Sequence, residues 1–383
     1  MSDPLYPLYS VAAFLGFIAV LAPLPWHLQA WNVGTCAYMI WTALACLNCF
    51  TNSVVWSNDA INRAPIWCDI SIRIFAGATL GIPASALCIV RRLYKIASLN
   101  STSVTRAEKR RAVMLDLFIA VVFPIILTAL QYVVQGHRFD VIEEVGCMVF
   151  LYNTPVAYVI TFMWPVIFGV VSAVYCVLSL LAFRRRQLDL QQFMHTNKSM
   201  TINRYLRLMA LASVETICTT PLAIFVIVLN STTMPVQSWV SWEDTHFNFS
   251  RVAQIPSVMW RTNHLLVVSL QLSRWAPILC AFVFFMFFGF AEESRKNYAA
   301  LFRSIARYIG LSRFHSTMQS KNSSKWSLGS PGEQPPSYSR RCSPQTTSTS
   351  WSETITPVDP SPFIVPFDFE RSRDVFSNPP PRP

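Results

Sequence analysis

The chain has 383 residues, of which 52% are hydrophobic and only 13% are charged, and its net charge is +11. Soluble globular proteins carry about 25% charged residues, so this composition argues against a soluble helical enzyme and for a membrane protein. The basic residues lie beside long apolar runs, which favours anionic lipid and cytoplasmic partners over nucleic acid.

Seven apolar runs are long enough to cross a hydrocarbon core of about 30 Å. The predicted spans are 5–26, 35–56, 74–90, 113–134, 156–183, 206–229 and 265–290. The first span follows Asp3 rather than a basic segment, and no A-x-A-like site comes after it, so we expect that it is not cleaved as a signal peptide. The sequence therefore predicts an all-α membrane protein, a bundle of seven transmembrane helices.

The charge of the loops predicts the orientation of the bundle. Lys and Arg are frequent between the third and fourth spans and between the fifth and sixth, whereas the opposite loops hold few. Because short cytoplasmic loops carry the excess of basic residues, we expect the N-terminus outside and the C-terminus in the cytoplasm. Asn230 and Asn248 open Asn-x-Ser/Thr triplets that would then face outward as candidate glycosylation sites, although such triplets also occur by chance.

The composition changes after the last span. Apolar residues recur with helical period over 293–310, with Lys and Arg on the other face, which predicts an amphipathic helix on the inner leaflet. Pro, Ser and Thr are dense in the remaining chain, which is typical of a disordered tail. We therefore expect a seven-span domain over 1–290, a juxtamembrane helix over 291–313 and a disordered cytoplasmic tail over 314–383.

Two of the ten cysteines are placed differently from the rest. Cys68 opens the third span at its outer end, and Cys147 lies in the outer loop between the fourth and fifth spans. A bridge on the oxidising side of the membrane would fix that loop over the mouth of the bundle. The alternative is two separate thiols.

Several ionisable residues and prolines lie within spans. Asp69 and Arg73 are four residues apart and share a helix face, either as ligand contacts or as a structural ion pair. Glu215 and Arg274 either form a latch between the sixth and seventh spans or meet water within the bundle. Of the prolines in the spans, we favour Pro221 and Pro277 as hinges, although Pro is common in membrane helices in general.

The outer loop over 230–263 is long and aromatic. Exposed aromatic side chains above a membrane suggest an amphiphilic ligand, while an interfacial aromatic belt explains part of the pattern. The ligand-binding candidates in this loop and in the loop before the fifth span, together with the third-span pair, are Asp69, Arg73, His137, Arg138, Trp242, Glu243, Asp244 and His246.

Enzyme signatures are missing from the sequence. It contains no H-E-x-x-H, G-x-S-x-G or G-x-x-x-x-G-K-[ST] motif, and its six His are scattered. We therefore expect no catalytic activity, no metal site and no cofactor. A seven-span transporter or channel is the alternative function. It is disfavoured because the sequence shows neither repeated halves nor a chain of carboxylates across the spans.

Seven long stretches carry a resemblance to a known family. They are 21–32 (LAPLPWHLQAWN), 57–70, 81–94 (GIPASALCIVRRLY), 108–117, 131–147, 241–252 and 280–298. In these stretches the chain resembles the fungal receptors for lipid-modified mating pheromones, the a-factor receptor type of class D G-protein-coupled receptors, and most of all their mushroom members. The residues after about 310 show no such resemblance.

The resemblance implies a plasma-membrane receptor that binds a farnesylated peptide pheromone, activates a heterotrimeric G protein and starts the mating response. It leaves room for a homodimer. We expect pheromone binding to shift the population towards a state that opens a cationic cleft for the Gα C-terminus, although topology alone accounts for some of the cations. The residues expected in this cleft are Arg91, Arg92, Lys95, Arg184, Arg185, Arg186 and Arg204. The third span ends in RRLY over 91–94 rather than in a D/E-R-Y triplet, so that ionic lock is not carried over.

Overall fold

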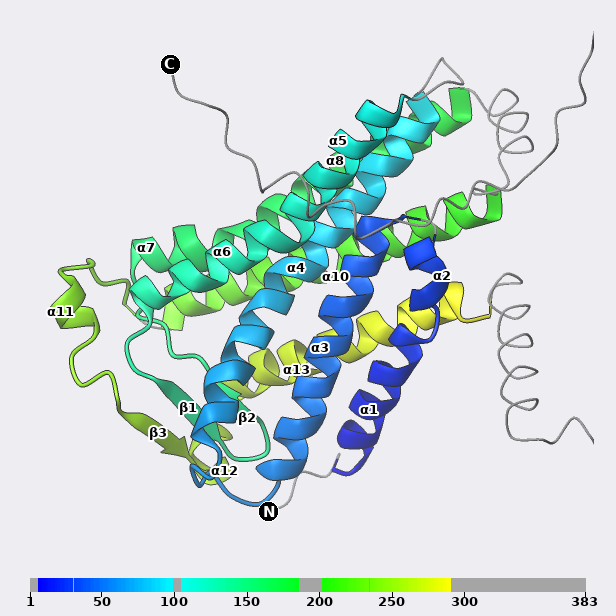
Figure 1. Cartoon of the computed structure of the whole chain (residues 1–383). Helices are drawn as coiled ribbons and strands as arrows, with labels where there is room; N and C mark the ends of the chain where they lie inside the picture. Colours follow the sequence, from blue (N-terminus) through cyan, green and yellow to red (C-terminus); the bar gives the residue numbers. More distant parts are fainter. Residues whose placement is uncertain (1–5, 30, 99–104, 186–201, 234, 291–383) are drawn as a thin grey trace, which may run out of the picture. The chain divides into compact units, whose positions relative to one another are not determined.

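The structure is a computed structural model that describes residues 6–29, 31–98, 105–185, 202–233 and 235–290. Within these ranges, seven helical segments are long and apolar enough to cross a membrane (Figure 1). They cover Leu8–Gln29, Val33–Val55, Pro65–Ser98, Arg106–Val134, Pro155–Arg185, Ile202–Thr233 and His264–Phe288. The predicted seven-transmembrane bundle is confirmed, and all described residues belong to one contact unit, Met1–Ser316.

Most spans are single helices, and three are interrupted. The single helices are α3 (Val33–Val55), α4 (Pro65–Ser98), α10 (Ile202–Thr233) and α13 (His264–Phe288). The first span consists of α1 (Leu8–Leu21) and α2 (Leu24–Gln29). The fourth consists of α5 (Arg106–Leu117), the π-helical η1 (Phe118–Val122), α6 (Phe123–Leu130) and the 3₁₀ turn η2 (Gln131–Val134). The fifth consists of α7 (Pro155–Ala157), the π-helical η3 (Tyr158–Phe162) and α8 (Met163–Arg185).

The third and fourth spans extend beyond the predicted apolar cores. The third was expected over 74–90 but forms a helix from Pro65 to Ser98, and the fourth begins at Arg106 instead of 113. Hydropathy marks only the part of a helix that lies in hydrocarbon, whereas Arg, Lys, Glu and Leu continue a helix readily in water. The basic residues on both sides of this connection are therefore helical.

A tertiary hydrogen bond compensates for one of the prolines in the spans. Pro124 has no N–H to donate to the carbonyl of Ala120, which lies four residues earlier in the π-helical turn η1. The indole Nε1 of Trp41 in α3 donates to this carbonyl at 2.9 Å. The broken ladder of the fourth span is thus completed by a neighbouring helix, as a membrane interior requires.

The third span, α4, is the most buried of the seven and α10 is the least. α4 packs against α3 and α8 and also contacts α6 and α10. Small residues permit the close approach of α3: a Cβ added at Gly81 would lie 2.3 Å from Nε1 of Trp41. The apolar core of the bundle therefore forms around α4.

Three short strands join two loops, which the sequence analysis did not predict. β1 (Phe139–Ile142) pairs antiparallel with β2 (Gly146–Met148) and parallel with β3 (Val252–Ile255), in the order β2-β1-β3. Two further short helices, α11 (Trp242–Thr245) and α12 (Ser257–Trp260), flank β3 (Figure 1). We call this end of the bundle the sheet end, and the opposite end, with the C-terminus of α4 and the N-termini of α5 and α10, the basic end.

Part of the domain prediction lies outside the described residues. This applies to the amphipathic helix expected over 291–313, to the disordered tail expected over 314–383 and to Arg186 of the cationic cleft. These remain predictions.

Candidate functional site

A disulfide fastens the sheet to the bundle. The structure joins Cys68, in the first turns of α4, to Cys147 in β2, with a Cα–Cα separation of 5.3 Å, and both side chains are buried. Gly146 precedes Cys147 with φ 93°, and a Cβ there would lie 2.4 Å from Cβ of Asn52. Only glycine fits this turn. The hairpin is therefore packed against Asn52 of α3 at Gly146 and bonded to α4 at Cys147.

Asp69 and Arg73 find their partners in the segment that follows the fourth span. Arg138 donates to both carboxylate oxygens of Asp69, at 3.0 and 2.6 Å, and this hydrogen bonding raises the pKa of Arg138. Arg73 donates to the side chain of Gln135 and to the carbonyl of Thr128 at 3.4 Å. The sequence analysis left open whether Asp69 and Arg73 pair with each other or contact a ligand, and the structure gives each a different partner.

His137 is buried between two charged groups. Its Nδ1 lies 3.3 Å from the Arg251 guanidinium and its Nε2 lies 2.5 Å from Oδ1 of Asp140. A guanidinium can only donate, so Nδ1 accepts, and the ring hydrogen is on Nε2, which donates to Asp140. Burial raises the pKa of Asp140, and the hydrogen bond from His137 lowers it in part. The His137 ring therefore connects Asp140 of β1 to Arg251, the residue before β3.

Charged pairs also hold the second loop against the first. Arg261 donates to the Glu144 carboxylate at 2.5 Å, and Glu143 accepts from the backbone N–H of Ser257 at 2.6 Å. Together with the pairing of β1 and β3, these contacts make the two loops at the sheet end one structural unit.

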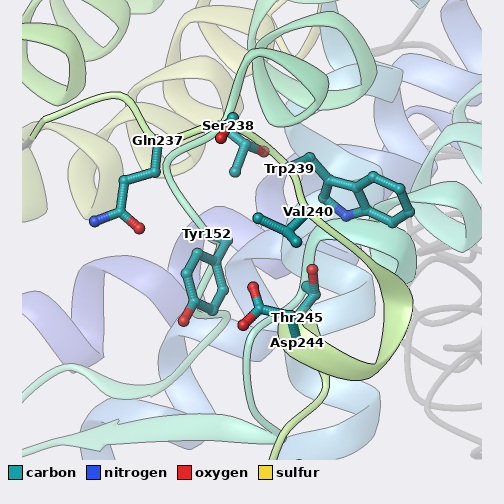
Figure 2. Close-up of a pocket in the computed structure, with 8 residues that line it drawn as sticks. Tyr152, Gln237, Ser238, Trp239, Val240, Asp244 and Thr245 are labelled. Atoms are coloured by element: carbon teal, nitrogen blue, oxygen red, sulfur yellow. The ribbon is translucent and has the colours of Figure 1, made fainter.

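A cavity of about 320 Å³ lies beside this unit (Figure 2). It is lined by Tyr152, Thr154, Gln237, Ser238, Trp239, Val240, Asp244 and Thr245. Of the sequence-predicted ligand residues, only Asp244 lines it. Trp239 belongs to the loop over 230–263 that the sequence analysis described as aromatic, but that analysis missed Tyr152 and Gln237 as cavity residues.

The other candidates in this loop lie elsewhere. Trp242 and His246 stack with ring centroids 4.0 Å apart, and both rings contact Tyr132 at the end of the fourth span. Glu243 is exposed and does not line the cavity. Asn248 is exposed, whereas Asn230 is half-buried in α10 and its side chain donates to the carbonyl of Val226.

The buried carboxyl group of Glu215 connects three helices in the middle of the bundle. Tyr38 of α3 donates to its Oε2 at 3.1 Å, and Cys280 of α13 donates to the same oxygen at 3.2 Å. Arg274, the partner expected for Glu215, instead lies over the ring of Tyr9, 4.1 Å from its centroid. A latch with Arg274 was one of the two alternatives that the sequence left open for Glu215, and the structure links Glu215 to Tyr38 and Cys280 instead.

The two favoured prolines differ in their surroundings. Pro277 is buried, its carbonyl accepts from Cys46 of α3, and Tyr9 of α1 donates to the nearby carbonyl of Arg274 at 3.3 Å. Pro221 is exposed, six residues after Glu215 in the least buried span. Around Pro277, α13 is therefore hydrogen-bonded to α1 and α3, whereas α10 is exposed at Pro221.

The predicted cationic residues at the basic end fall into two groups. Arg91 pairs with Asp116 of α5, and Arg92 donates to the carbonyl of Trp31 at 2.9 Å and to Asn32 at 3.2 Å. Lys95, Arg184 and Arg185 are exposed, and Arg204 is half-buried near Arg92. The sequence analysis missed Asp116, although an acidic residue inside an apolar span, five residues after Arg111, is a signal that could have indicated it.

Comparison with known proteins decides the family. Residues 8–309 match the STE3 family, described as pheromone A receptor. The chain belongs to the STE3 family. The match covers all seven spans of the structure, so this STE3 protein is a multi-pass membrane protein and the resemblance noted in the sequence is confirmed.

Individual STE3-type relatives agree with this assignment. The chain is 56% identical over 311 residues to the pheromone B alpha 3 receptor of Schizophyllum commune, covering 81% of this chain and 50% of the relative. It is 34% identical to pheromone receptor 1 of Mycosarcoma maydis, covering 79% and 84%, and 25% identical to the pheromone a factor receptor of Saccharomyces cerevisiae, covering 76% and 60%. The chain spans about half the length of the Schizophyllum relatives it matches.

Proposed function

We propose that this STE3 protein is a G-protein-coupled receptor for a peptide mating pheromone and activates a heterotrimeric G protein. The observation that carries the proposal is the contrast between the two ends of one bundle. A disulfide-fastened sheet borders a cavity at one end, and exposed cations lie at the other. A transporter or channel is not favoured, because the relatives are named as pheromone receptors.

The sheet end is proposed to face outward and the basic end the cytoplasm. Positive charge near the ends of short loops favours the cytoplasmic side, and a disulfide forms in an oxidising compartment. Both criteria give the same orientation, with the N-terminus outside. They also put Asn248 and the cavity where a secreted ligand can reach them.

A farnesyl group on the peptide fits the exposed apolar side chains around the cavity. Val240, Trp242 and Phe247 are all strongly exposed, at 70%, 49% and 82% of their surface. Such a patch above a membrane needs an apolar partner, and an isoprenoid chain supplies one. We therefore propose that the lipid part of the ligand covers this patch, either directly or after first entering the membrane.

Signal transfer is proposed to pass through α10. The latch formed by Tyr38, Glu215 and Cys280 holds the basic-end half of this helix to α3 and α13. A buried hydrogen bond of this kind contributes roughly 0.5–1.5 kcal/mol, and a coupling of about 1 kcal/mol is enough for a ligand-driven population shift. Bending at Pro221 would break the latch, move the N-terminal half of α10 and open the cleft beside Arg92 and Arg204 to the Gα C-terminus.

The test is made in yeast cells that lack their own a-type receptor and carry this chain with a pheromone-response reporter. Farnesylated mushroom pheromone peptides and the same peptides without farnesyl are applied. A response to one or a few farnesylated peptides, lost on deletion of Gα, is the expected result. Silence towards every peptide, with surface expression verified, would overturn the proposed ligand class.

A further inference from the structure

The cavity at the sheet end has one charged side chain among the residues that line it, Asp244. Figure 2 shows this carboxylate directed toward Tyr152 with Val240 close by, whereas the Trp239 indole is directed away from both. Gln237, Ser238 and Thr245 add polar groups. The lining therefore places a carboxylate opposite an aromatic ring, and both groups attract organic cations.

Hydrogen bonds hold the walls of this cavity together without a ligand. The backbone N–H of Gln237 donates to the carbonyl of Asn153 at 2.9 Å, next to Tyr152. The Asn153 side chain donates to the carbonyls of Asn230 and Pro235, at 3.1 and 3.3 Å. The extended segment after α10 is thereby fixed along the segment after β2, so the cavity is preformed.

The position of Asp244 is fixed as well. Ser241 caps α11, since its hydroxyl accepts from the Asp244 N–H at 3.2 Å. On either side of Asp244, the rings of Trp242 and His246 stack on each other and contact the ring of Tyr132. The carboxylate is thus held at the cavity by contacts that leave its own oxygens open to a ligand.

Charge at the sheet end supports a cationic ligand group. The arginines of the two loops are engaged: Arg138 with Asp69, Arg251 with His137, and Arg261 with Glu144. Within the described residues, the Asp244 carboxylate has no ion-pair partner. A cationic group of the ligand could therefore pair with the Asp244 carboxylate without displacing an arginine.

The size of the cavity limits what enters it. At about 320 Å³ it lies at the lower end of the range for small-molecule pockets, roughly 300–1,000 Å³. It suits one side chain or one chain terminus and is too small for a whole lipopeptide. The exposed side chains of Trp242 and Phe247 do not line it and are left for the lipid.

We propose that this cavity binds a single cationic group of the pheromone, an ammonium or guanidinium, through Asp244, with the ring of Tyr152 contacting its other side. The inference rests on the proposed receptor function and assigns the chemistry of one ligand contact. The cation comes either from a Lys or Arg side chain or from the N-terminal amine of the peptide.

The experiment compares Asp244→Asn with Glu243→Gln, a change of the neighbouring carboxylate that lies outside the cavity. Both are expressed in the reporter yeast and tested with the peptide that activates the wild-type receptor. Loss of a charge-assisted contact predicts a fall in potency of roughly tenfold or more for Asp244→Asn and a change within about twofold for Glu243→Gln. Asp244→Glu should restore part of the loss, and surface expression is measured for each variant.

Modified peptides identify the source of the cation. One peptide carries an acetylated N-terminus, and another has its Lys or Arg replaced by Gln. The modification that removes the bound cation should cost the wild-type receptor as much potency as Asp244→Asn does, and should cost the Asp244→Asn receptor little more, since both remove the same contact.

The outcomes separate the two proposals. Three results would overturn this inference and leave the receptor function intact. The Asp244→Asn receptor could keep full potency, or its loss of potency could add to the loss caused by every peptide modification. A peptide with no cationic group could also keep full activity on the wild-type receptor. A wild-type receptor that responds to no peptide, with surface expression verified, would instead overturn the proposed ligand class.

Discussion

The two ends of this bundle are built differently. At the sheet end, a disulfide, a three-stranded sheet and pairs such as Arg138–Asp69 and Arg261–Glu144 bind loops that are far apart in the chain. At the basic end, cations outnumber carboxylates among the described residues, and several of them, including Arg184 and Arg185, are exposed. Like charges repel one another and need hydration, so the exposed cations of this end favour solvent, and the proposed G-protein contact lies here.

The difference teaches how one fold separates recognition from response. A preformed site loses little conformational freedom when a ligand binds. A response needs an element with two arrangements, and the least buried span, α10, provides it. Variants at either end of the bundle test this difference, and the largest effect is expected at the sheet end.

Removal of the disulfide should have the largest effect. Cys68→Ser frees the sheet from α4 and opens a loop closed across 79 residues, which costs roughly 2–5 kcal/mol of stability. We expect loss of the pheromone response and of most surface expression, measured by reporter and flow cytometry. Cys218→Ser, which changes a free exposed thiol in α10, is the control. A Cys68→Ser receptor with normal expression and potency would show that the bridge is not needed.

Removal of the latch should raise signalling without ligand. Tyr38→Phe deletes only the hydroxyl that donates to Glu215, and the helix α10 then leaves this arrangement more easily. We expect basal reporter output to rise about fivefold, which corresponds to a coupling of about 1 kcal/mol.

The matched control for the latch is Cys280→Ser, which keeps a donor to Glu215 and should leave basal output near the wild-type level. Tyr38→Phe should also add little to Glu215→Ala, because both remove the same contact. If Tyr38→Phe leaves basal output unchanged or lowers it, the latch does not hold the resting state.

The Arg91–Asp116 pair should contribute stability at the basic end. Both side chains are largely buried, at 12% and 8% exposed, so Asp116→Asn leaves a poorly hydrated cation and costs about 1–3 kcal/mol. We expect a lower thermal midpoint for the detergent-solubilised receptor. Arg110→Gln, at an exposed position of α5, serves for comparison, and equal shifts for the two variants would contradict a specific role for the pair.

The smallest effect is expected at the glycosylation triplets. Asn248 is exposed and lies outside any helix, whereas Asn230 is helical and its side chain is hydrogen-bonded. Asn248→Gln should speed the migration of the receptor on a gel and leave potency unchanged, while Asn230→Gln should alter neither. Faster migration of the Asn230 variant alone would reverse the assignment.

Much of the fold was readable from the sequence for a physical reason. A hydrocarbon core requires apolar runs of a minimum length and leaves no choice of secondary structure other than helix for them. The number and order of the spans therefore followed from hydropathy alone. Their ends did not, because α4 continues in water through Arg91, Arg92 and Lys95.

The candidate site was readable only in part. The predicted outer, oxidising side of the membrane identified Cys68 and Cys147, which the structure joins. The rarity of ionisable groups in spans identified Asp69, Arg73 and Glu215. The partners were out of reach, since Asp69 pairs with a residue 69 positions away and Glu215 with one 177 positions away. The helical four-residue spacing suggested the wrong partner for Asp69.

By itself, the sequence determined that this protein is a seven-span membrane protein of the pheromone receptor type with one strongly basic side. The tertiary structure alone decided that two loops form a sheet, that a cavity lies between Tyr152 and Asp244, and that Glu215 joins α10 to α3 and α13. Span formation is a local property of composition and length, whereas these features depend on which helices become neighbours when the bundle packs.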